Sequence, residues 1–424
     1  MGQLPVLLFE GIIDSILDMV DSAFGNNIDI DSICAMSAFV TLYIMVDVIC
    51  RLGEYVYRIE QQYFTECYAL QMLVSVGCTV VFAISSGWLP YLFQLTGRQR
   101  GLLQACILAK CLYLPLSRTR SFLAQYTTLT CQSKCMIGSS IVFWSTAILM
   151  NVVVTIFHGE CYHLVIMTGF AELTTVVFYL ICAKLPFARP SIRVLHGKIK
   201  PALNELVGKI FGNLSLLIFS TLASRMGTEA FALHSVGYGI ARSVSAITDC
   251  CSTVQLIQLK SVENIVDGYN ECKYVVRRIA APITLTVYAI ALIMVPFMHG
   301  EVAMVVAFVA TALYVLECIP VQLYESRRGF LTRYAEMKPI RMCGVFSLCI
   351  RTLIGFISIT SGIGIIGFAL CGFIDAAVTG SYLDYKSKKL VGGLANGFKQ
   401  CNTEITTALT ELAETIEDLA ESGK

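Results

Sequence analysis

The residues best suited to perform chemistry lie close to the amino terminus, where four carboxylates interrupt an apolar stretch. They are Glu10, Asp14, Asp18 and Asp21. Their spacing of four, four and three residues places them along one stripe of a helix. A carboxylate at the centre of a bilayer costs about 2.5–3.5 kcal/mol on insertion scales, so four of them should not face lipid. They must line the protein interior or water.

Such a stripe is suited to binding a cation. Burial beside like charges favours the protonated form of a carboxyl group, so the stripe can take up and release protons near neutral pH. Two carboxylates with the side-chain oxygens of Asn151 and Thr174 could instead hold a dehydrated Na⁺. We expect an H⁺ or Na⁺ site that includes Asp21 or Asp14, and no structural metal. The alternative is that these acids only pair with basic side chains such as Lys110, or line a water-filled vestibule without coupling to transport.

Further polar residues lie within apolar stretches. Glu172 either completes the cation site or pairs with a neighbour, and Asp47 is a candidate to join the amino-terminal acids. Glu317 is the candidate acid of the second half. Asp375 is a candidate partner for a lone arginine such as Arg351.

The amino-acid composition is too apolar for a protein surrounded by water alone, so part of the protein surface must contact lipid. Of the 424 residues, 56% are hydrophobic and only 14% are charged, whereas soluble domains carry about 25% charged residues. The net charge of +1 argues against nucleic acid as a partner. No Walker motif, metal-ligand cluster or nucleophile elbow is present, so we expect neither an enzyme nor a cofactor.

The chain contains twelve stretches long and apolar enough to cross a bilayer, which requires roughly 20 residues each. They lie near residues 5–25, 33–50, 66–95, 102–126, 136–157, 161–183, 203–224, 229–258, 276–298, 300–326, 342–360 and 362–384. Twenty Lys and Arg residues fall in the connections on one side, and three (Arg98, Arg100 and Arg225) on the other. This bias predicts that both termini lie in the cytoplasm. We expect a multi-pass protein of the plasma (inner) membrane.

The two halves of the sequence resemble each other. The segment SRTRSFL at 117–123, followed by Tyr126, recurs as SRRGFL at 326–331, followed by Tyr334. GFA at 169–171 returns at 367–369. Because each half has an even number of helices, the repeats should share one orientation in the membrane.

The organisation expected from this pattern has four parts. Residues 1–185 form the first six-helix lobe, 186–201 a cytoplasmic connecting loop, and 202–390 the second lobe. The glycines after residue 390 should loosen the chain before a short acidic amphipathic helix in a tail at 391–424, which either binds a cytosolic partner or is solvated.

Several short motifs carry a family resemblance. LP at 4–5 with MVDSAF at 19–24, GTEA at 227–230 with His234, Asn151, and the glycines at 362, 364 and 367 follow a recognisable order. Together they resemble the multidrug and toxic compound extrusion (MATE) family, within the multidrug/oligosaccharidyl-lipid/polysaccharide (MOP) flippase group.

The resemblance implies an all-α membrane protein in which two pseudo-symmetric six-helix bundles form a V around a central cavity. Substrate would leave the cell in exchange for incoming protons or sodium ions, and the position of Asp21 belongs to the cation site of several relatives. The chain departs from some relatives at Thr155, where they have an aspartate. Glu205 also lies too near the cytoplasmic end to match their mid-helix acid.

We therefore expect a monomeric H⁺- or Na⁺-coupled antiporter that exports amphipathic organic compounds. One alternative is a lipid-linked saccharide flippase of the same group, which the acidic character of the first two helices disfavours. Another is a non-transporting scaffold or receptor whose tail recruits a partner.

Overall fold

The computed structural model describes residues 29–422 except 187, 240, 242–264, 276–277, 279–280, 299–303 and 335. Within these residues the regular structure is entirely helical. The helices of the first half are α2 (Ile30–Cys50), α3 (Leu52–Ile59), α4 (Phe64–Ser85), α5 (Gly97–Cys111), α6 (Leu114–Leu129), α7 (Ser133–Ile156) and α8 (Cys161–Cys182), with short 3₁₀ turns at Leu89–Leu92 and Ile192–Leu195.

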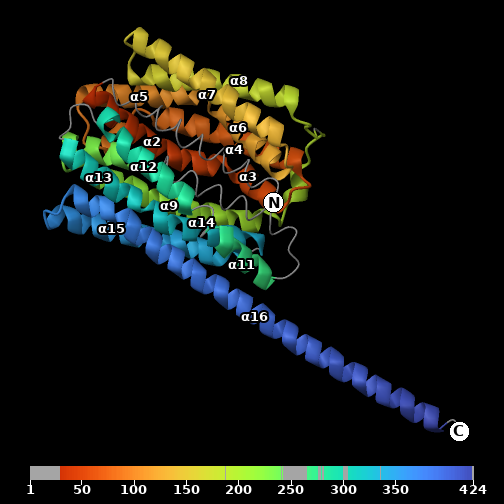
Figure 1. The fold of residues 1–424 in the computed structure, drawn as a ribbon. Helices are drawn as coiled ribbons and strands as arrows, with labels where there is room; N and C mark the ends of the chain where they lie inside the picture. The colour runs from red at the N-terminus through yellow and green to blue at the C-terminus, as the bar shows by residue number, and fades with distance from the viewer. Residues whose placement is uncertain are drawn as a thin grey trace.

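The second half contains α9 (Ile199–Ser224), α11 (Ile265–Val275), α12 (Ala281–Met298), α13 (Met304–Leu316), α14 (Cys318–Arg333), α15 (Met337–Thr360) and α16 (Ile365–Ser422). A further helical segment spans 228–239. Figure 1 shows these helices packed lengthwise, with α5, α7 and α8 on one side of the body and α15 and the first part of α16 on the other.

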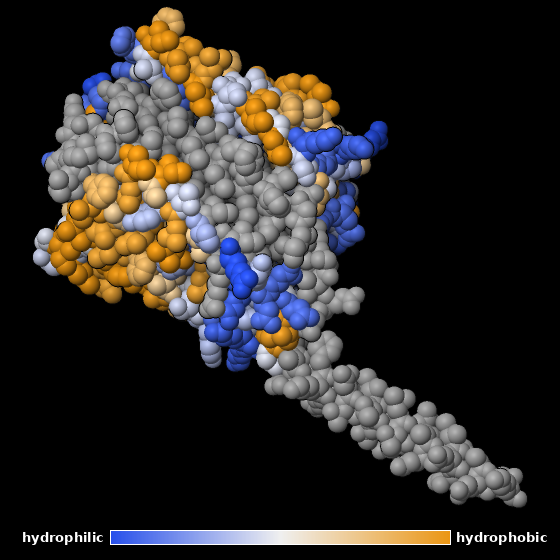
Figure 2. Space-filling view, viewed as in Figure 1, coloured by the Kyte–Doolittle hydropathy of each residue, from blue (hydrophilic) through white to orange (hydrophobic). Residues whose placement is uncertain are grey.

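The outer faces of the helices are apolar, as lipid contact requires. Seven described helices are long and apolar enough to span a membrane. Leu73, Val81 and Ile84 of α4 are 65%, 67% and 77% exposed, and hydrophobic side chains cover broad areas of the face in Figure 2. A soluble protein exposes few apolar patches of this extent, so the chain is a multi-pass membrane protein.

Two expected spans are each divided by a break at a proline. The stretch 102–126 forms α5 and α6, and 300–326 contains α13 and α14. Pro115 lies four residues after the end of α5, and Pro320 four residues after the end of α13. Because a proline ring clashes with the carbonyl group four residues earlier and provides no N–H, it ends or kinks a helix there.

In the first half, the loops between helices lie at two opposite ends of the helical body, and side-chain contacts join the loops at each end. At one end Arg98 pairs with Asp29 at 3.0 Å and with Asp31 at 3.4 Å. At the other end the Tyr126 hydroxyl donates to the Lys184 carbonyl group, and Thr65 donates to the Pro186 carbonyl group at 3.1 Å. These contacts agree with helices that alternate in direction through the membrane.

The repeated motif occupies equivalent surroundings in the two halves. Phe122 of α6 and Phe330 of α14 are both fully buried. Phe122 contacts Tyr57 of α3 at 5.4 Å between ring centroids, and Phe330 contacts Tyr269 of α11 at 5.8 Å. The similarity of the sequences at 117–123 and 326–331 is therefore matched by similar packing.

The two halves meet where α2 and α3 pack against α9. The Thr41 hydroxyl lies 3.5 Å from that of Ser220, the Asn213 amide donates to the Ile44 carbonyl group at 3.4 Å, and Arg58 pairs with Glu205 at 3.6 Å. Glu205 thus forms an ion pair between the halves near one end of α9. The domain boundaries at 185 and 202 stay predictions.

The expected break after residue 390 is wrong. α16 continues to Ser422 as one helix, and its carboxyl-terminal part extends far from the body in Figure 1. Glycine disfavours a helix interior by only about 1 kcal/mol, and good helix formers surround the glycines at 392, 393 and 397. The tail is therefore a continuation of the last membrane helix.

Candidate functional site

The amino-terminal acids Glu10, Asp14, Asp18 and Asp21 lie outside the described residues. The cation site expected around Asp21 and Asp14 therefore stays a prediction. The structure does describe the polar residues expected near it, and a second polar cluster in the other half.

The first-half cluster begins on α2. The carboxylate of Asp47 pairs with Arg118 of α6 at 2.6 Å and with Arg51 at 2.7 Å. Arg118 also donates to the Tyr43 hydroxyl at 3.0 Å and to the Ser117 hydroxyl at 3.2 Å. Arg118 is only 4% exposed, so its charge requires the carboxylate in this position.

Ser117 connects Asp47 and Arg118 to the second acid of the cluster. Its hydroxyl donates to Glu172 of α8 at 3.0 Å and accepts from the ammonium group of buried Lys110 at 3.4 Å. Glu172 also pairs with Arg120. Glu172 was expected either to complete the cation site or to pair with a neighbour, and the described contacts show the pairing.

The structure does not bring Thr174 and Glu172 together. Thr174 is exposed, donates to the Ala171 carbonyl group at 3.0 Å and lies 3.5 Å from the Thr146 hydroxyl. Two residues apart on a helix, Glu172 and Thr174 point in nearly opposite directions. Asn151 of α7 is buried at 2% exposure, on a helix that packs against α8.

The second-half cluster is centred on Arg351 of α15. Its guanidinium group pairs with Asp375 of α16 at 2.6 Å and with Glu317, between α13 and α14, at 3.2 Å. The Ser347 hydroxyl donates to the other oxygen of Asp375 at 2.7 Å. The expected partnership of Asp375 with a lone arginine is present, and Glu317 belongs to the same group.

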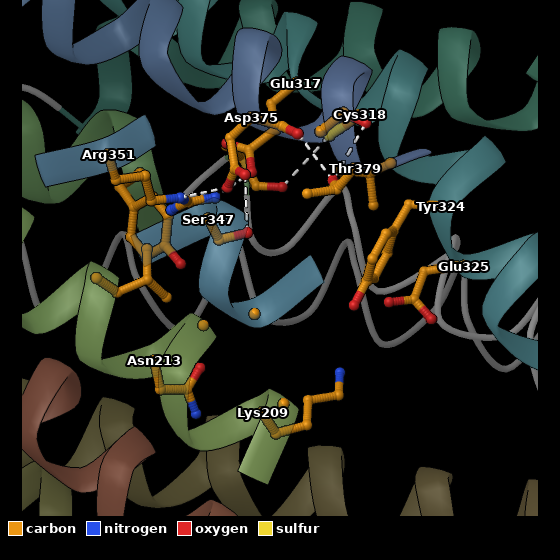
Figure 3. A pocket seen from close by; sticks show the side chains of 18 residues that line it. Lys209, Asn213, Glu317, Cys318, Tyr324, Glu325, Ser347, Arg351, Asp375 and Thr379 are labelled. Atoms are coloured by element: carbon orange, nitrogen blue, oxygen red, sulfur yellow. Dashed lines mark hydrogen bonds and ion pairs between the residues drawn. The ribbon is translucent and has the colours of Figure 1, made fainter. Parts of the chain in front are cut away.

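A cavity of about 210 Å³ adjoins this second-half cluster. Figure 3 shows Glu317, Arg351 and Asp375 on one wall, with Lys209 and Asn213 of α9 on the opposite wall. Because Asn213 also contacts α2, the cavity lies beside the boundary between the halves. Charged side chains from several helices thus converge on one cavity, which is typical of a binding site.

Two glycines hold α9 and α15 close enough to form this arrangement. A Cβ atom on Gly344 would lie 2.1 Å from the carbonyl oxygen of Gly208, and one on Gly208 would lie 3.0 Å from the Arg341 Cα atom. Small residues at a helix crossing permit such close approach. Ser347 and Arg351 follow Gly344 by about one and two turns, so the crossing positions both of them.

The close contact of Glu317 with α16 also depends on a glycine. A Cβ atom on Gly372 would lie 2.0 Å from the carboxylate of Glu317. The sequence showed Glu317, Arg351 and Asp375 as charges within apolar stretches. Nothing in the sequence indicated Lys209, Asn213 and Ser347, because only the packing of the helices brings these polar residues to the cavity.

His234 of the 228–239 segment is a packed histidine. It is 2% exposed, lies 2.6 Å from the Tyr314 hydroxyl and 3.3 Å from the Ser220 hydroxyl. Both ring nitrogens therefore have neutral partners, which favours a structural role for this side chain.

No protein-family model matches the chain, and no curated protein matches its sequence. Solved structures do match its fold. An inward-facing multidrug resistance MATE family transporter of the MOP superfamily has a TM-score of 0.71 at 12% identity, over 93% of this chain and 99% of that one. An outward-facing structure described in the same terms has a TM-score of 0.63 at 12% identity, over 93% and 96%.

A MOP superfamily transporter from Pyrococcus furiosus has a TM-score of 0.65 at 13% identity, over 92% of this chain and 96% of that one. It is described as having a binding pocket of reversed polarity that suggests a different function. The chain therefore has the fold of the MATE transporters of the MOP superfamily, as its sequence motifs indicated. These neighbours are transporters, not enzymes.

Proposed function

We propose that the protein is a proton-coupled secondary transporter that exports amphipathic organic compounds by alternating access. The observation that carries this proposal is a pair of carboxylates, half-buried Glu317 and buried Asp375, held by one arginine at the edge of a cavity. The fold supports it, because neighbours with this fold are described in inward-facing and outward-facing conformations.

The charges of this cluster favour a proton over a sodium ion. With both carboxylates ionised, Glu317, Asp375 and Arg351 have a net charge of −1, and one proton makes the group neutral. A sodium ion between the carboxylates would have to displace the guanidinium group or lie beside it, and like charges repel strongly in a poorly polarisable interior. Proton binding requires no such displacement.

The cavity wall carries charges of both signs. Its charged lining consists of Lys209, Arg351, Glu317, Glu325 and Asp375, and Glu325 pairs with Arg328 at 2.6 Å. Pockets for drug-sized ligands typically measure about 300–1,000 Å³, so a substrate of that size needs the second-half helices that line the cavity to move apart.

The alternative, a lipid-linked saccharide flippase, is favoured by one feature of the first half. Arg51, Lys110, Arg118 and Arg120 outnumber the carboxylates of Asp47 and Glu172 in the described cluster. A basic excess suits a pyrophosphate group. In the proposed antiporter, the amino-terminal acids at 10, 14, 18 and 21 balance this excess instead. The protein would lie in the plasma (inner) membrane with both termini cytoplasmic.

Replacing Glu317 by glutamine is expected to abolish proton coupling while leaving the fold intact, because the amide has similar volume but cannot exchange a proton. The purified protein is reconstituted into liposomes with an internal pH dye, and proton release is measured on adding a panel of organic cations. Separate H⁺ and Na⁺ titrations of thermal stability require no substrate. Asp21→Asn is measured alongside, and exposed Asp267→Asn of α11 is the control.

The wild type and Asp267→Asn should respond to protons, and Glu317→Gln should respond at least about tenfold less. A response lost only in Asp21→Asn would place coupling in the first half. A response to Na⁺ but not to H⁺ would contradict proton coupling. Stabilisation by a lipid-linked pyrophosphate substrate, without any cation response, would favour the flippase.

A further inference from the structure

A second pocket lies at the opposite end of α15 from Thr360. It has a volume of about 490 Å³ and lies between the start of α15 and the middle of α16. Lys338 of α15 and both Lys386 and Lys389 of α16 line it. By the distribution of Lys and Arg along the chain, this end faces the cytoplasm.

The lysines of this pocket have no carboxylate partner among the described residues. The nearby acid of α16, Asp384, pairs with Arg327 at 2.8 Å and with Lys388 at 2.6 Å, and accepts from the Tyr269 hydroxyl at 3.0 Å. The carboxylate of Asp384 therefore already has other partners than the lysines of the pocket. Glu336 is the single acid in the pocket lining.

The backbone adds to the positive potential. α15 begins at the pocket, and Glu336 at its N-cap makes no side-chain capping hydrogen bond. The first-turn amide groups of a helix are donors without helical partners and carry partial positive charge. Three lysine side chains and the N-terminus of α15 thus line one pocket. Pro339 in this first turn has no N–H, so Met337 and Lys338 supply the free backbone donors.

The remainder of the pocket is apolar and aromatic. Leu331, Met342 and Leu390 line it, and Tyr382 forms part of the wall. The Tyr382 ring packs edge-on against Phe346 at 5.1 Å, and Lys386 lies 5.4 Å from its centroid. Figure 2 shows hydrophilic surface where α16 leaves the body, adjoining hydrophobic surface. A ligand with an anionic headgroup for the lysines and an aliphatic chain for the apolar side chains matches this arrangement.

We propose that this pocket binds the phosphate headgroup of an anionic phospholipid of the cytoplasmic leaflet, with an acyl chain against Leu331, Met342 and Leu390. Basic pockets between membrane helices on the cytoplasmic side bind such headgroups. The volume is in the range of small-molecule pockets. The ligand lies apart from the Glu317 cavity, so this assignment does not depend on the transported substrate.

The test uses the full-length protein in detergent, titrated with phosphatidylglycerol, phosphatidylcholine or inorganic phosphate, with bound lipid measured by native mass spectrometry. The test variant is Lys338→Gln/Lys386→Gln/Lys389→Gln. The matched control is Lys134→Gln/Lys184→Gln/Lys200→Gln, which removes three exposed lysines from the same end of the molecule. Retained phosphatidylcholine binding verifies that each variant is folded.

The wild type and the control should prefer phosphatidylglycerol over phosphatidylcholine, and the test variant should lose roughly tenfold or more of its affinity for phosphatidylglycerol. This estimate is conservative, since each lysine near an anionic surface contributes about a factor of five. An equal loss in both variants would overturn the proposal, as would no preference in the wild type.

One further outcome would replace the lipid with another ligand. Binding of inorganic phosphate with the same affinity as phosphatidylglycerol would make this a free-phosphate site.

Discussion

Replacing Arg351 by methionine is expected to destabilise the protein by about 3 kcal/mol, the lower end of the usual cost of removing one partner from a buried ion pair, because Arg351 and Glu317 are partly exposed to the cavity. The change leaves the carboxylates of Glu317 and Asp375 without their shared counter-charge. Asp375 is 3% exposed, so the surrounding protein solvates its charge poorly once the guanidinium group is removed. The measurement is the thermal unfolding midpoint of the purified protein in detergent.

The destabilisation should be relieved by removing the charges that cause it. In the triple variant Arg351→Met/Glu317→Gln/Asp375→Asn, stability should return close to that of the wild type, because neutral replacements of a buried charge cluster are often tolerated. Arg100→Met is the control, since Arg100 is exposed and surface changes usually alter stability by less than about 0.5 kcal/mol. A triple variant as unstable as Arg351→Met would show that the arginine acts through packing alone.

Much of the architecture could be predicted from the sequence, because a bilayer imposes a length on every apolar helix. α7, α8 and α9 begin and end within a few residues of the stretches expected for them, whereas α4 ends at Ser85, ten residues before the expected 95. The breaks near Pro115 and Pro320 were missed because apolar composition continues through them. The uninterrupted α16 was missed because three glycines were given more weight than the helix formers between them.

The candidate sites were predicted less completely. A charge within an apolar stretch is a local signal, and it identified Glu172, Glu317 and Asp375. Their partners lie on other helices, and spacing along one helix cannot show which helices pack together. Thr174 lies exposed, away from Glu172, and its expected place beside the amino-terminal acids stays a prediction.

The close crossing of α9 and α15 predicts that a larger residue at Gly344 causes a large loss of stability. Replacing Gly344 by alanine is expected to destabilise the protein by about 3 kcal/mol or more, at the upper end of overpacking costs. The added Cβ atom would lie 2.1 Å from the carbonyl oxygen of Gly208. Backbone atoms cannot rotate away as a flexible side chain can, so the helices must separate. Thermal unfolding measures the loss of stability.

The matched control is Gly77→Ala in α4, where an added Cβ atom meets no other atom within 4 Å. Alanine in a helix interior is favoured over glycine by roughly 0.5–1 kcal/mol, so this change should leave stability unchanged or raise it. The two identical substitutions should therefore act in opposite directions. Because Ser347 and Arg351 follow Gly344 on α15, Gly344→Ala should also weaken the proton response. A Gly344→Ala protein as stable as the wild type would contradict the crossing, and with it the placement of Arg351 beside the cavity.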